Sequence, residues 1–243
     1  MRSDGRSSIQ TRPIRITPNF TKNPAGSVLI ETGETRVLCT VHVDDGVPNW
    51  MRNSNPPQGW LTAEYSMLPG ATHSRMKRER NFVSGRTQEI QRLIGRSLRG
   101  IIDFKKCPDM TFMVDCDVIQ ADGGTRTAAI TGSYVALKIA IDKLLRSGKL
   151  KTNPLTDGVA AVSVGIKEGK ILVDLDYKED SQADIDMNLV FTHSGKILEI
   201  QGTAERAAFS KEEVNNTMNA AEEALSKTFE LQQQAADYQT VES

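Results

Sequence analysis

The chain has 243 residues, of which 38% are hydrophobic and 25% are charged, a composition typical of a globular protein with a buried core. Its 30 basic and 31 acidic residues nearly cancel, which does not favour a protein that coats polyanions. No apolar run approaches the roughly 20 residues that span a bilayer, and the polar start has no signal-peptide core. We therefore expect a cytoplasmic protein that does not bind membranes.

In the first half, residues 28–43 predict a β-hairpin, because two arms rich in β-branched residues surround a turn at residues 32–34. Residues 87–102 predict a helix with apolar side chains at helical spacing and arginines on another face. A strand follows over residues 111–120. The next helix, residues 127–146, has little polar surface, which indicates that it is buried nearly all round at the centre of the fold.

In the second half, two more hairpins are predicted over residues 161–175 and 188–202, with turns at Glu168-Gly169 and Ser194-Gly195. A final helix begins at Ser210, where Glu213 completes a capping box. The polar, glutamine-rich end, about residues 231–243, predicts a frayed tail.

This order of elements predicts an α+β fold in which largely antiparallel or mixed sheets pack against helices. The pattern of strands and then helices occurs twice, so we expect two similar halves, about residues 10–146 and about 159–230. A connector rich in Gly, Pro, Asn and Lys joins them over about residues 147–158. We interpret the whole chain, 1–243, as a single domain.

Cysteine and histidine offer little for catalysis. Cys39, Cys107 and Cys116 form no CxxC pair, which excludes the usual zinc and thiol-exchange motifs and indicates a reducing compartment. The three histidines lie far apart in the sequence, so no HxxH or HExxH helix exists to hold a metal. Any chemistry must therefore depend on Arg, Asp, Thr and backbone groups.

Charge is balanced overall but separated locally. Residues 75–99 contain eight basic residues and two acids, whereas residues 174–186 contain six acids and one lysine. A basic strip suits a phosphate backbone, and an acidic cluster suits a hard cation such as Mg²⁺. The alternative is that both are solvated faces that only keep the protein soluble.

Residues 121–127, between a strand and the buried helix, have the composition of a phosphate-binding turn. Gly123 and Gly124 let the backbone approach an anion, the helix start offers unpaired N–H groups, and Thr125 and Arg126 add a hydroxyl and a guanidinium. The alternative is a turn with no ligand. Arg86 lies at the start of the other predicted helix, where a cation opposes the helix dipole and favours a nearby anion.

Two groups of acids compete as a metal site. The carboxylates of residues 177–188 lie on a loop and at the start of a strand, where they can converge on one cation. Asp115 and Asp117 share one face of a strand, and alternating acids are more typical of its solvent side. No Ser/His/Asp or Cys/His triad can be assembled with any specificity.

With these residues in place, the chain resembles the RNase PH family, phosphate-dependent 3′ exoribonucleases that trim tRNA precursors. The resemblance runs almost end to end, and the order and spacing of its segments are specific; residues 50–58, the loop 76–84 and the tail match less well. The segments are GSVLIETGETRVLCT (26–40), GWLTAEYSMLPGATHSR (59–75), GRTQEIQRLIGRSLR (85–99), DCDVIQADGGTRTAAITG (115–132), KTNPLTDGVAAVSVGI (151–166), DLDYKEDSQADIDMN (174–188) and EIQGTAE (199–205).

The resemblance implies a role for particular residues. Arg86 and the turn Gly124-Thr125-Arg126 match the motifs that bind the attacking inorganic phosphate, and Asp180 and Asp186 match the acids assigned to metal binding and catalysis. It also implies a fold of two pseudo-repeated halves, like the second domain of ribosomal protein S5. A ring-shaped homohexamer, a trimer of dimers, is the assembly that the family forms.

The residues and the resemblance together favour reversible phosphorolysis of RNA 3′ ends. Phosphate held by the arginines and the glycine-rich turn would attack the last linkage, and Mg²⁺ (or Mn²⁺) on Asp180 and Asp186 would stabilise the developing charge. The products would be a nucleoside 5′-diphosphate and an RNA that is one residue shorter.

We expect the basic strip to hold tRNA precursors and other structured RNA, but not DNA, through phosphates rather than bases. A subunit interface is the alternative for the helix arginines. One rival function is a hydrolytic nuclease that uses Asp115, Asp117, Asp180 and Asp186 with two metals, and another is an inactive ring subunit that only binds RNA, as occurs among related exosome proteins. The expected RNA-binding residues are Arg75, Lys77, Arg78, Arg80, Arg92, Arg96 and Arg99.

Overall fold

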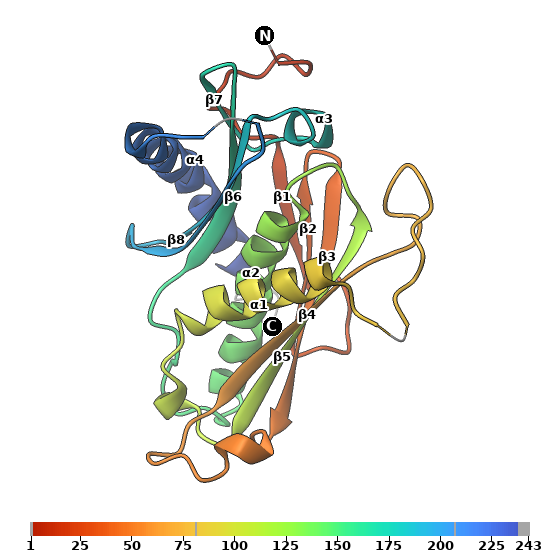
Figure 1. The fold of residues 1–243 in the computed structure, drawn as a ribbon. Coiled ribbons are helices and arrows are strands. Elements are labelled where there is room, and N and C mark those ends of the chain that lie inside the picture. Colours follow the sequence, from red (N-terminus) through yellow and green to blue (C-terminus); the bar gives the residue numbers. More distant parts are fainter. Residues whose placement is uncertain (1, 81, 207, 238–243) are drawn as a thin grey trace.

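Two β-sheets, one from each half of the chain, form the framework of the fold (Figure 1). The computed structural model describes residues 2–80, 82–206 and 208–237. The first sheet contains, in spatial order, β1 (Ile14–Pro18), β2 (Gly26–Thr32), β3 (Thr35–Asp45), β5 (Met110–Gln120) and β4 (Trp60–Met67). The second sheet contains β7 (Lys170–Val173), β6 (Val159–Lys167), β8 (Ile185–Thr192) and β9 (Ile197–Ala204).

All three predicted hairpins are confirmed. β2 pairs with β3, β6 with β7 and β8 with β9, and each pair is antiparallel. β5 lies antiparallel to β3 but parallel to β4, so the first sheet is mixed, in agreement with the predicted α+β fold. Gly169 and Gly195 have φ angles of 72° and 79°, left-handed values that favour glycine in their turns.

Two strands of the first sheet, β1 and β4, are not predicted from the sequence. In β4 the buried side chains of Leu61, Ala63 and Tyr65 alternate with exposed polar ones, so a period-two pattern was present as a signal. β1 is short and ends in Pro18, which cannot donate a ladder hydrogen bond and weakens the pattern.

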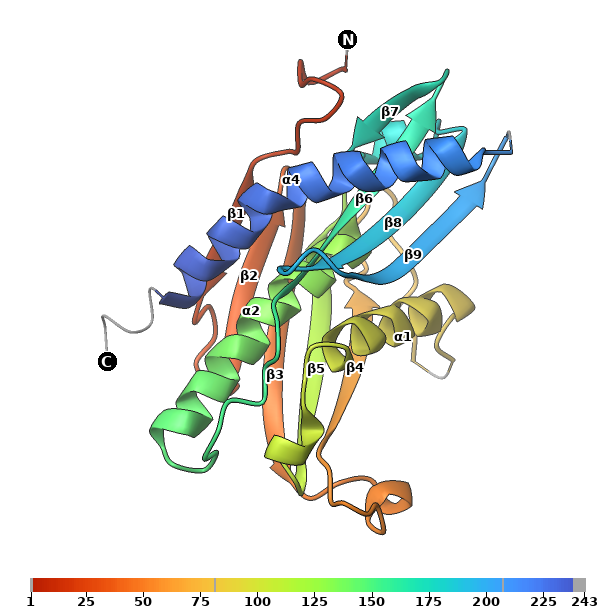
Figure 2. The same ribbon diagram turned by 90° about the vertical axis from the view of Figure 1, so that its left-hand side faces the viewer.

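Helices pack on both sheets. The first sheet lies along one side of α2 and β6 lies along another, which explains why α2 is buried nearly all round, as predicted (Figure 2). None of the helices in the described ranges is long and apolar enough to cross a membrane. The helices are α1 (Gly85–Arg99), α2 (Thr125–Arg146), the one-turn α3 (Tyr177–Asp180) and α4 (Lys211–Asp237), with 3₁₀ turns at Asn49–Met51 and Phe104–Lys106.

The last helix extends further than the sequence suggests. A frayed tail is predicted from about residue 231, but α4 continues to Asp237, and Gln232 is buried. The side-chain amide of Gln232 donates to the carbonyl oxygens of Thr131 at 2.9 Å and Val159 at 3.0 Å. The prediction fails there because a polar side chain finds its partners in distant segments. The rest of the predicted tail, 238–243, lies outside the described residues.

The two halves share their hydrophobic core. β6 is buried on both faces: Val159 and Ala161 join the cluster around the first sheet and α2, whereas Ala160 and Val162 join the cluster that contains α4 residues. The second sheet therefore lies between α2 and α4, and α4 reaches across to β1. Because apolar side chains cross the boundary between the halves, their relative position is set by close packing.

β2 approaches α2 closely at Gly26, where an added Cβ would overlap the carbonyl oxygen of Ala136. We expect Gly26→Ala to lower the free energy of unfolding by about 1–3 kcal/mol, because backbone must move to make room. Urea unfolding at fixed protein concentration measures this change. Gly70→Ala is the matched control, since a Cβ at that position meets nothing within 4 Å. Equal losses for the two variants would contradict the packing argument.

Candidate active site

The residues predicted to bind phosphate and metal lie together on one cleft of about 510 Å³. The first half supplies the start of α1 and the turn before α2, and the second half supplies α3 and the first residues of β8. The cleft is lined by Arg86, Gly123, Gly124, Thr125, Arg126, Asp180 and Asp186, with Met67, Thr72, His73, Ser74, Met76, Ala121, Ser163, Tyr177 and Asn188 forming the remaining walls.

The glycine-rich turn at the start of α2 depends on backbone that other residues rarely adopt. Gly123 and Gly124 have φ angles of 72° and 65°, and Gly124 is the N-cap of α2 without any side chain to cap it. The helix start therefore presents N–H groups that the N-cap residue leaves for a ligand. The hydroxyl of Thr125 lies 2.8 Å from the buried phenol oxygen of Tyr65, which orients it.

The two predicted phosphate-binding arginines are held differently. Arg126, whose side chain is 22% exposed, donates from Nη1 to Oε1 of Gln201 at 3.2 Å and to Oε1 of Glu89 at 3.4 Å. Arg86 is exposed, and its Nη1 lies 3.8 Å from the sulfur of Met67. Within the described ranges, no carboxylate forms an ion pair with Arg86 at 4.0 Å or less. Positive charge is thus available to an incoming anion.

The surroundings of the two cleft aspartates disfavour their negatively charged forms. Burial raises the pKa of Asp180, although the nearby Arg126 and Arg86 lower it. Burial and then the charge of Asp180 raise the pKa of Asp186 to about 6. The Oδ1 atom of Asp186 is buried and has no hydrogen-bond partner. A cation beside this pair would relieve both the repulsion and the unpaired oxygen.

The donor set fits a magnesium ion better than a metal that needs a closed protein cage. Asp180 and Asp186 supply hard oxygen ligands. Among the described residues, no group of three or more His, Cys, Asp or Glu side chains is placed to hold a metal. Mg²⁺ is commonly bound by one or two carboxylates together with water and substrate phosphates.

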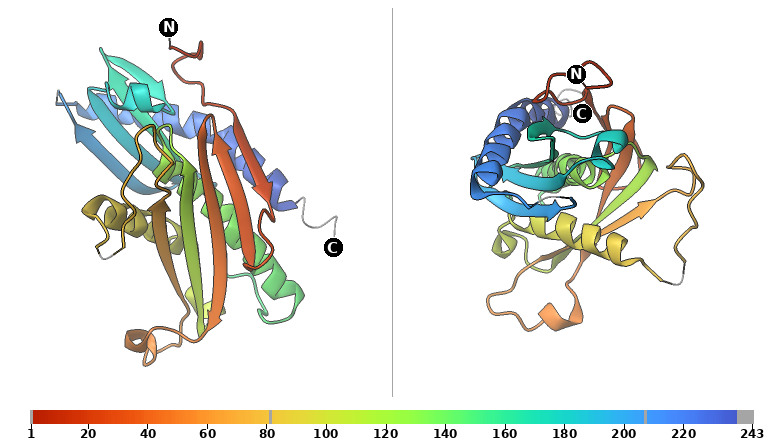
Figure 3. Two further views of the ribbon diagram at one scale, coloured as in Figure 1. Left: turned by 90° about the vertical axis from the view of Figure 1, so that its right-hand side faces the viewer. Right: turned by 45° about the horizontal axis from the view of Figure 1, so that its top comes forward.

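Asp115 and Asp117 lie elsewhere. Their neighbours Val114 and Cys116 point into the core, so the two acids lie on the opposite face of the first sheet, where Figure 3 shows no helix. Burial, followed by Glu64, raises the pKa of Asp115. Neither acid lines the cleft, and a site shared with the aspartates of the second half is not formed.

The predicted RNA-binding residues fall into two groups. The loop residues from Arg75 to Arg80 are exposed, and the residues just before them, Thr72–Ser74, line the cleft. On α1, Arg92 is exposed. The other two α1 arginines of this set, Arg96 and Arg99, have partners inside the chain.

Arg96 and Arg99 contact other parts of the chain. Arg96 donates to Glu199 of β9 at 2.6 Å. The guanidinium of Arg99 lies 4.8 Å from the ring centre of Trp60 and donates to the carbonyl oxygen of Leu61 at 3.0 Å. Both residues therefore help to fasten α1 to the two sheets, whatever else they bind.

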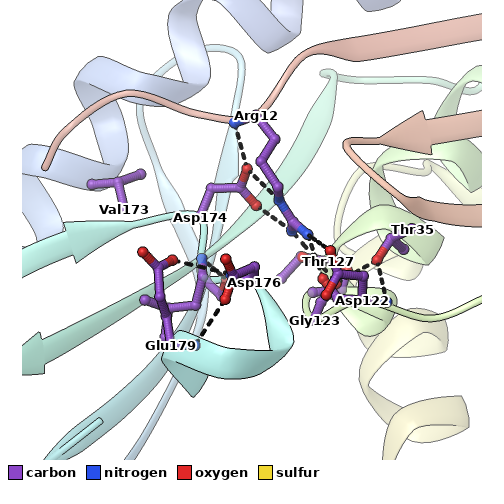
Figure 4. A network of polar contacts seen from close by, with 12 residues as sticks. Arg12, Thr35, Asp122, Gly123, Thr127, Val173, Asp174, Asp176 and Glu179 are labelled. Carbon is purple, nitrogen blue, oxygen red and sulfur yellow. Dashed lines mark hydrogen bonds and ion pairs between the residues drawn. The ribbon is translucent and has the colours of Figure 1, made fainter. Parts of the chain in front are cut away.

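No pattern in the sequence singles out the arginine that contacts both the turn before α2 and the loop before α3. Arg12 is buried against Asp174, and its guanidinium also reaches the turn before α2 (Figure 4). In the sequence, Asp174 is one of the six acids of residues 174–186. Only the fold reveals the pair, because its members are 162 positions apart.

Comparison with known proteins identifies the family. Residues 10–141 match domain 1 of the 3′ exoribonuclease family, and residues 157–224 match domain 2. The chain belongs to the 3′ exoribonuclease family. It is 52% identical to ribonuclease PH of Bacillus subtilis (strain 168), with 96% of each chain covered. It is 53% identical to ribonuclease PH of Mycolicibacterium smegmatis, with 97% of this chain and 92% of the relative covered.

Membership of this family confirms the enzyme class predicted from the sequence. The chain is a phosphate-dependent 3′–5′ exoribonuclease of tRNA processing. The rival interpretations, a hydrolytic nuclease and an inactive RNA-binding subunit, are therefore not supported.

Solved structures show the same fold. Rice Rrp46 aligns with a TM-score of 0.77 at 21% identity, covering 96% of this chain and 98% of that chain. A subunit of the Archaeoglobus fulgidus exosome with RNA bound to the active site aligns with a TM-score of 0.81 at 21% identity, covering 94% and 91%. The predicted two-part RNase PH fold is confirmed.

The raised pKa of Asp186 makes stability depend on pH. Its pKa of about 6 in the folded protein exceeds the ordinary aspartate value, so folding opposes ionisation, and stability falls as the pH rises from about 4 to 6. At pH 7.5, we expect the free energy of unfolding of Asp186→Asn to be higher than that of the wild type by on the order of 2 kcal/mol, because asparagine carries no charge. At pH 4 the two values should be equal. Urea unfolding with EDTA present measures the difference.

The control for this experiment is Asp44→Asn, which changes an exposed aspartate of β3. This variant should follow the wild type at both pH values. An Asp186→Asn protein that is no more stable than the wild type at pH 7.5 would contradict the assigned pKa direction.

Proposed function

We propose that the cleft holds inorganic phosphate against the 3′-terminal linkage of RNA. Arg86, Thr125, Arg126 and the backbone of Gly124 would bind the phosphate. The observation that carries this assignment is that these groups, from two helix starts, line one cleft with the acids of the other half. This arrangement brings cationic donors and carboxylates together in the same space.

Electrostatics explains why the site needs two arginines. Phosphate and the RNA phosphodiester are both anions, and their approach in a partly desolvated cleft costs several kcal/mol unless cations and N–H groups offset it. Arg86 and Arg126 would supply this compensation, and the amides at the start of α2 would add to it. Gln201 and Glu89 hold Arg126 before substrate arrives, whereas Arg86 is exposed and is held mainly by its helix backbone.

Asp180 and Asp186 would hold Mg²⁺ or Mn²⁺ on the other wall. When bound, the cation would supply positive charge to the phosphoryl oxygens during transfer. Tyr65 would keep the Thr125 hydroxyl aimed at the phosphate, since their oxygens lie 2.8 Å apart. Glu89 and Gln201 would restrict the swing of Arg126.

The reaction balances as the transfer of a nucleotidyl group from a ribose 3′ oxygen of the RNA to an oxygen of inorganic phosphate, with the proton of hydrogen phosphate ending on the 3′ oxygen. An oxygen of inorganic phosphate forms a bond to the phosphorus of the last linkage, and the bond from that phosphorus to the preceding 3′ oxygen breaks. The products are a nucleoside 5′-diphosphate and an RNA with a free 3′ hydroxyl. The linkage broken and the diphosphate formed differ modestly in energy, so the step runs in both directions.

We further propose that the exposed loop residues Arg75, Lys77, Arg78 and Arg80 guide the 3′ ends of tRNA precursors and other structured RNA into the cleft. The support is that the loop continues directly from the cleft wall at Thr72–Ser74. Arg92 would add to this path, or would lie at an interface of a homohexamer built as a trimer of dimers.

The three cysteines are free and buried, which agrees with a cytoplasmic enzyme.

Phosphate dependence tests the proposed site. We expect Arg86→Ala to raise the phosphate KM roughly 10- to 100-fold, because a charged hydrogen-bonding partner of the anion is lost, and to change the RNA KM far less. Steady-state assays on a tRNA precursor with Mg²⁺, with chromatography of the released nucleotides, measure both. Arg15→Ala is the control, because the Arg15 side chain on β1 is exposed, and this variant should match the wild type. A larger effect on RNA than on phosphate would reassign Arg86.

Salt dependence tests the proposed RNA path. We expect the double variant Arg78→Ala/Arg80→Ala to weaken RNA binding and to make the slope of log affinity against log salt shallower by roughly 0.7 for each lost contact. Fluorescence anisotropy over a salt series measures the slope, and size-exclusion chromatography checks the assembly. An intact assembly with an unchanged slope would remove the loop from the RNA path.

A further inference from the structure

A buried arginine connects the two walls of the cleft. Arg12 and Asp174 are 5% and 4% exposed; Asp174 begins the loop that leads to α3, and Arg12 lies between it and the turn before α2 (Figure 4). Nε of Arg12 donates to Oδ2 of Asp174 at 3.0 Å, and Nη2 donates to Oδ1 at 2.7 Å. The backbone N–H of Arg12 also donates to Oδ2 at 2.7 Å. The carboxylate is therefore held by a two-pronged contact and an amide.

The same guanidinium holds the glycine-rich turn from the other side. Nη1 of Arg12 donates to the carbonyl oxygen of Asp122, and Nη2 lies 3.4 Å from that of Gly123. Thr35 completes the support, because its hydroxyl donates to the Gly123 oxygen at 2.7 Å and accepts from the N–H of Asp122 at 2.9 Å. One side chain thus bonds simultaneously to segments from both halves of the chain.

The two segments also touch directly. A Cβ on Gly123 would lie 2.5 Å from the carbonyl oxygen of Leu175, so only glycine permits the observed approach. The N–H of Tyr177, the first residue of α3, donates to Oδ1 of Asp122 at 3.3 Å. Asp174 itself has a φ of 55°, a left-handed value that is uncommon for aspartate. The chain adopts this conformation where the carboxylate meets Arg12.

The position of α3 is fixed from its other side by the N-terminal segment. Arg2 forms a two-pronged contact with Glu179, at 2.7 and 2.6 Å, and also donates to the carbonyl oxygen of Asp174 at 2.8 Å. Glu179 closes a capping box with Asp176 at the start of α3. Asp180 is the next residue, and its N–H donates to the carbonyl oxygen of Asp176 at 2.9 Å.

We propose that Arg12 and Asp174 are positioning residues that set the separation between the phosphate-binding turn and Asp180. This inference rests on the proposed function, because it concerns the alignment of the phosphate and metal positions. Neither residue lines the cleft or touches substrate. Their effect passes through the carbonyls of Asp122 and Gly123 on one wall and the loop before α3 on the other. An error of about 1 Å in such an alignment is enough to cost about 100-fold in rate.

The test uses the coupling between two ligands that the cleft would bind side by side. In the wild type, phosphate should tighten Mn²⁺ binding by about fivefold or more, and Mn²⁺ should tighten phosphate binding by the same factor. Electron paramagnetic resonance titrations of Mn²⁺ with and without phosphate measure this factor. The main variant is Arg12→Met/Asp174→Asn, which removes both charges of the buried pair; the buried Arg6, 3.6 Å from Asp174, keeps Asp4 and Glu179 as ion-pair partners.

In this double variant, we expect each ligand alone to bind within about threefold of the wild type, while the coupling falls below about twofold. The kcat of phosphorolysis should fall at least about tenfold with little change in the RNA KM. Arg12→Lys is the second variant. It keeps a charge opposite Asp174 but cannot reach both turn carbonyls, so it should lose part of the coupling while folding like the wild type.

Arg15→Met is the matched control, since Arg15 is an exposed arginine three positions away that pairs only loosely with Glu31 at 3.8 Å. It should keep the full coupling. Wild-type coupling and kcat in both Arg12 variants would overturn the inference and leave the proposed function intact. Mn²⁺ binding that survives in Asp180→Asn, or a wild type without coupling, would instead overturn the proposed function and this inference with it.

Discussion

The arrangement of charge across the cleft is the constraint on which the structure depends. Arg86 and Arg126 come from the first half of the chain, and Asp180 and Asp186 come from the second. Charges of opposite sign act on a common substrate only if the two halves keep a fixed separation. α2 provides much of this fixation, because its first residues form part of the cleft while its body is packed between the first sheet and β6. The packing that joins the two halves therefore also sets the geometry of the site.

Local patterns in the sequence are sufficient for most of the framework. The hairpins, the three long helices and the mixed α+β character follow from residue periodicity and turn chemistry, since these depend on neighbours in the chain. The family motifs also identify the residues that the structure gathers in the cleft. What the sequence does not reveal is the partner of a polar group when that partner is distant. In the sequence, Gln232 is part of a polar tail and Asp174 is one acid among six. Their partners, Thr131 and Arg12, are evident only in the fold.

The same limit applies to charged clusters. The basic strip is continuous in sequence, but the structure divides it into an exposed loop and a helix on which Arg96 and Arg99 have partners inside the chain. Burial raises the pKa of Asp115 and Asp117, as it does for the cleft aspartates, yet they lie on the other face of the first sheet. Charge counts show that such groups exist, whereas burial and neighbours decide which of them act together.

The reach of α4 has a consequence for how the protein is made. Ala235 and Ala236, near the end of the described helix, belong to the cluster of the first sheet and α2. During synthesis the first half leaves the ribosome long before α4 does. Part of the apolar surface of that half therefore stays exposed until α4 packs on it. The nascent chain is thus exposed to aggregation until α4 has been made, and chaperone demand should concentrate in that interval.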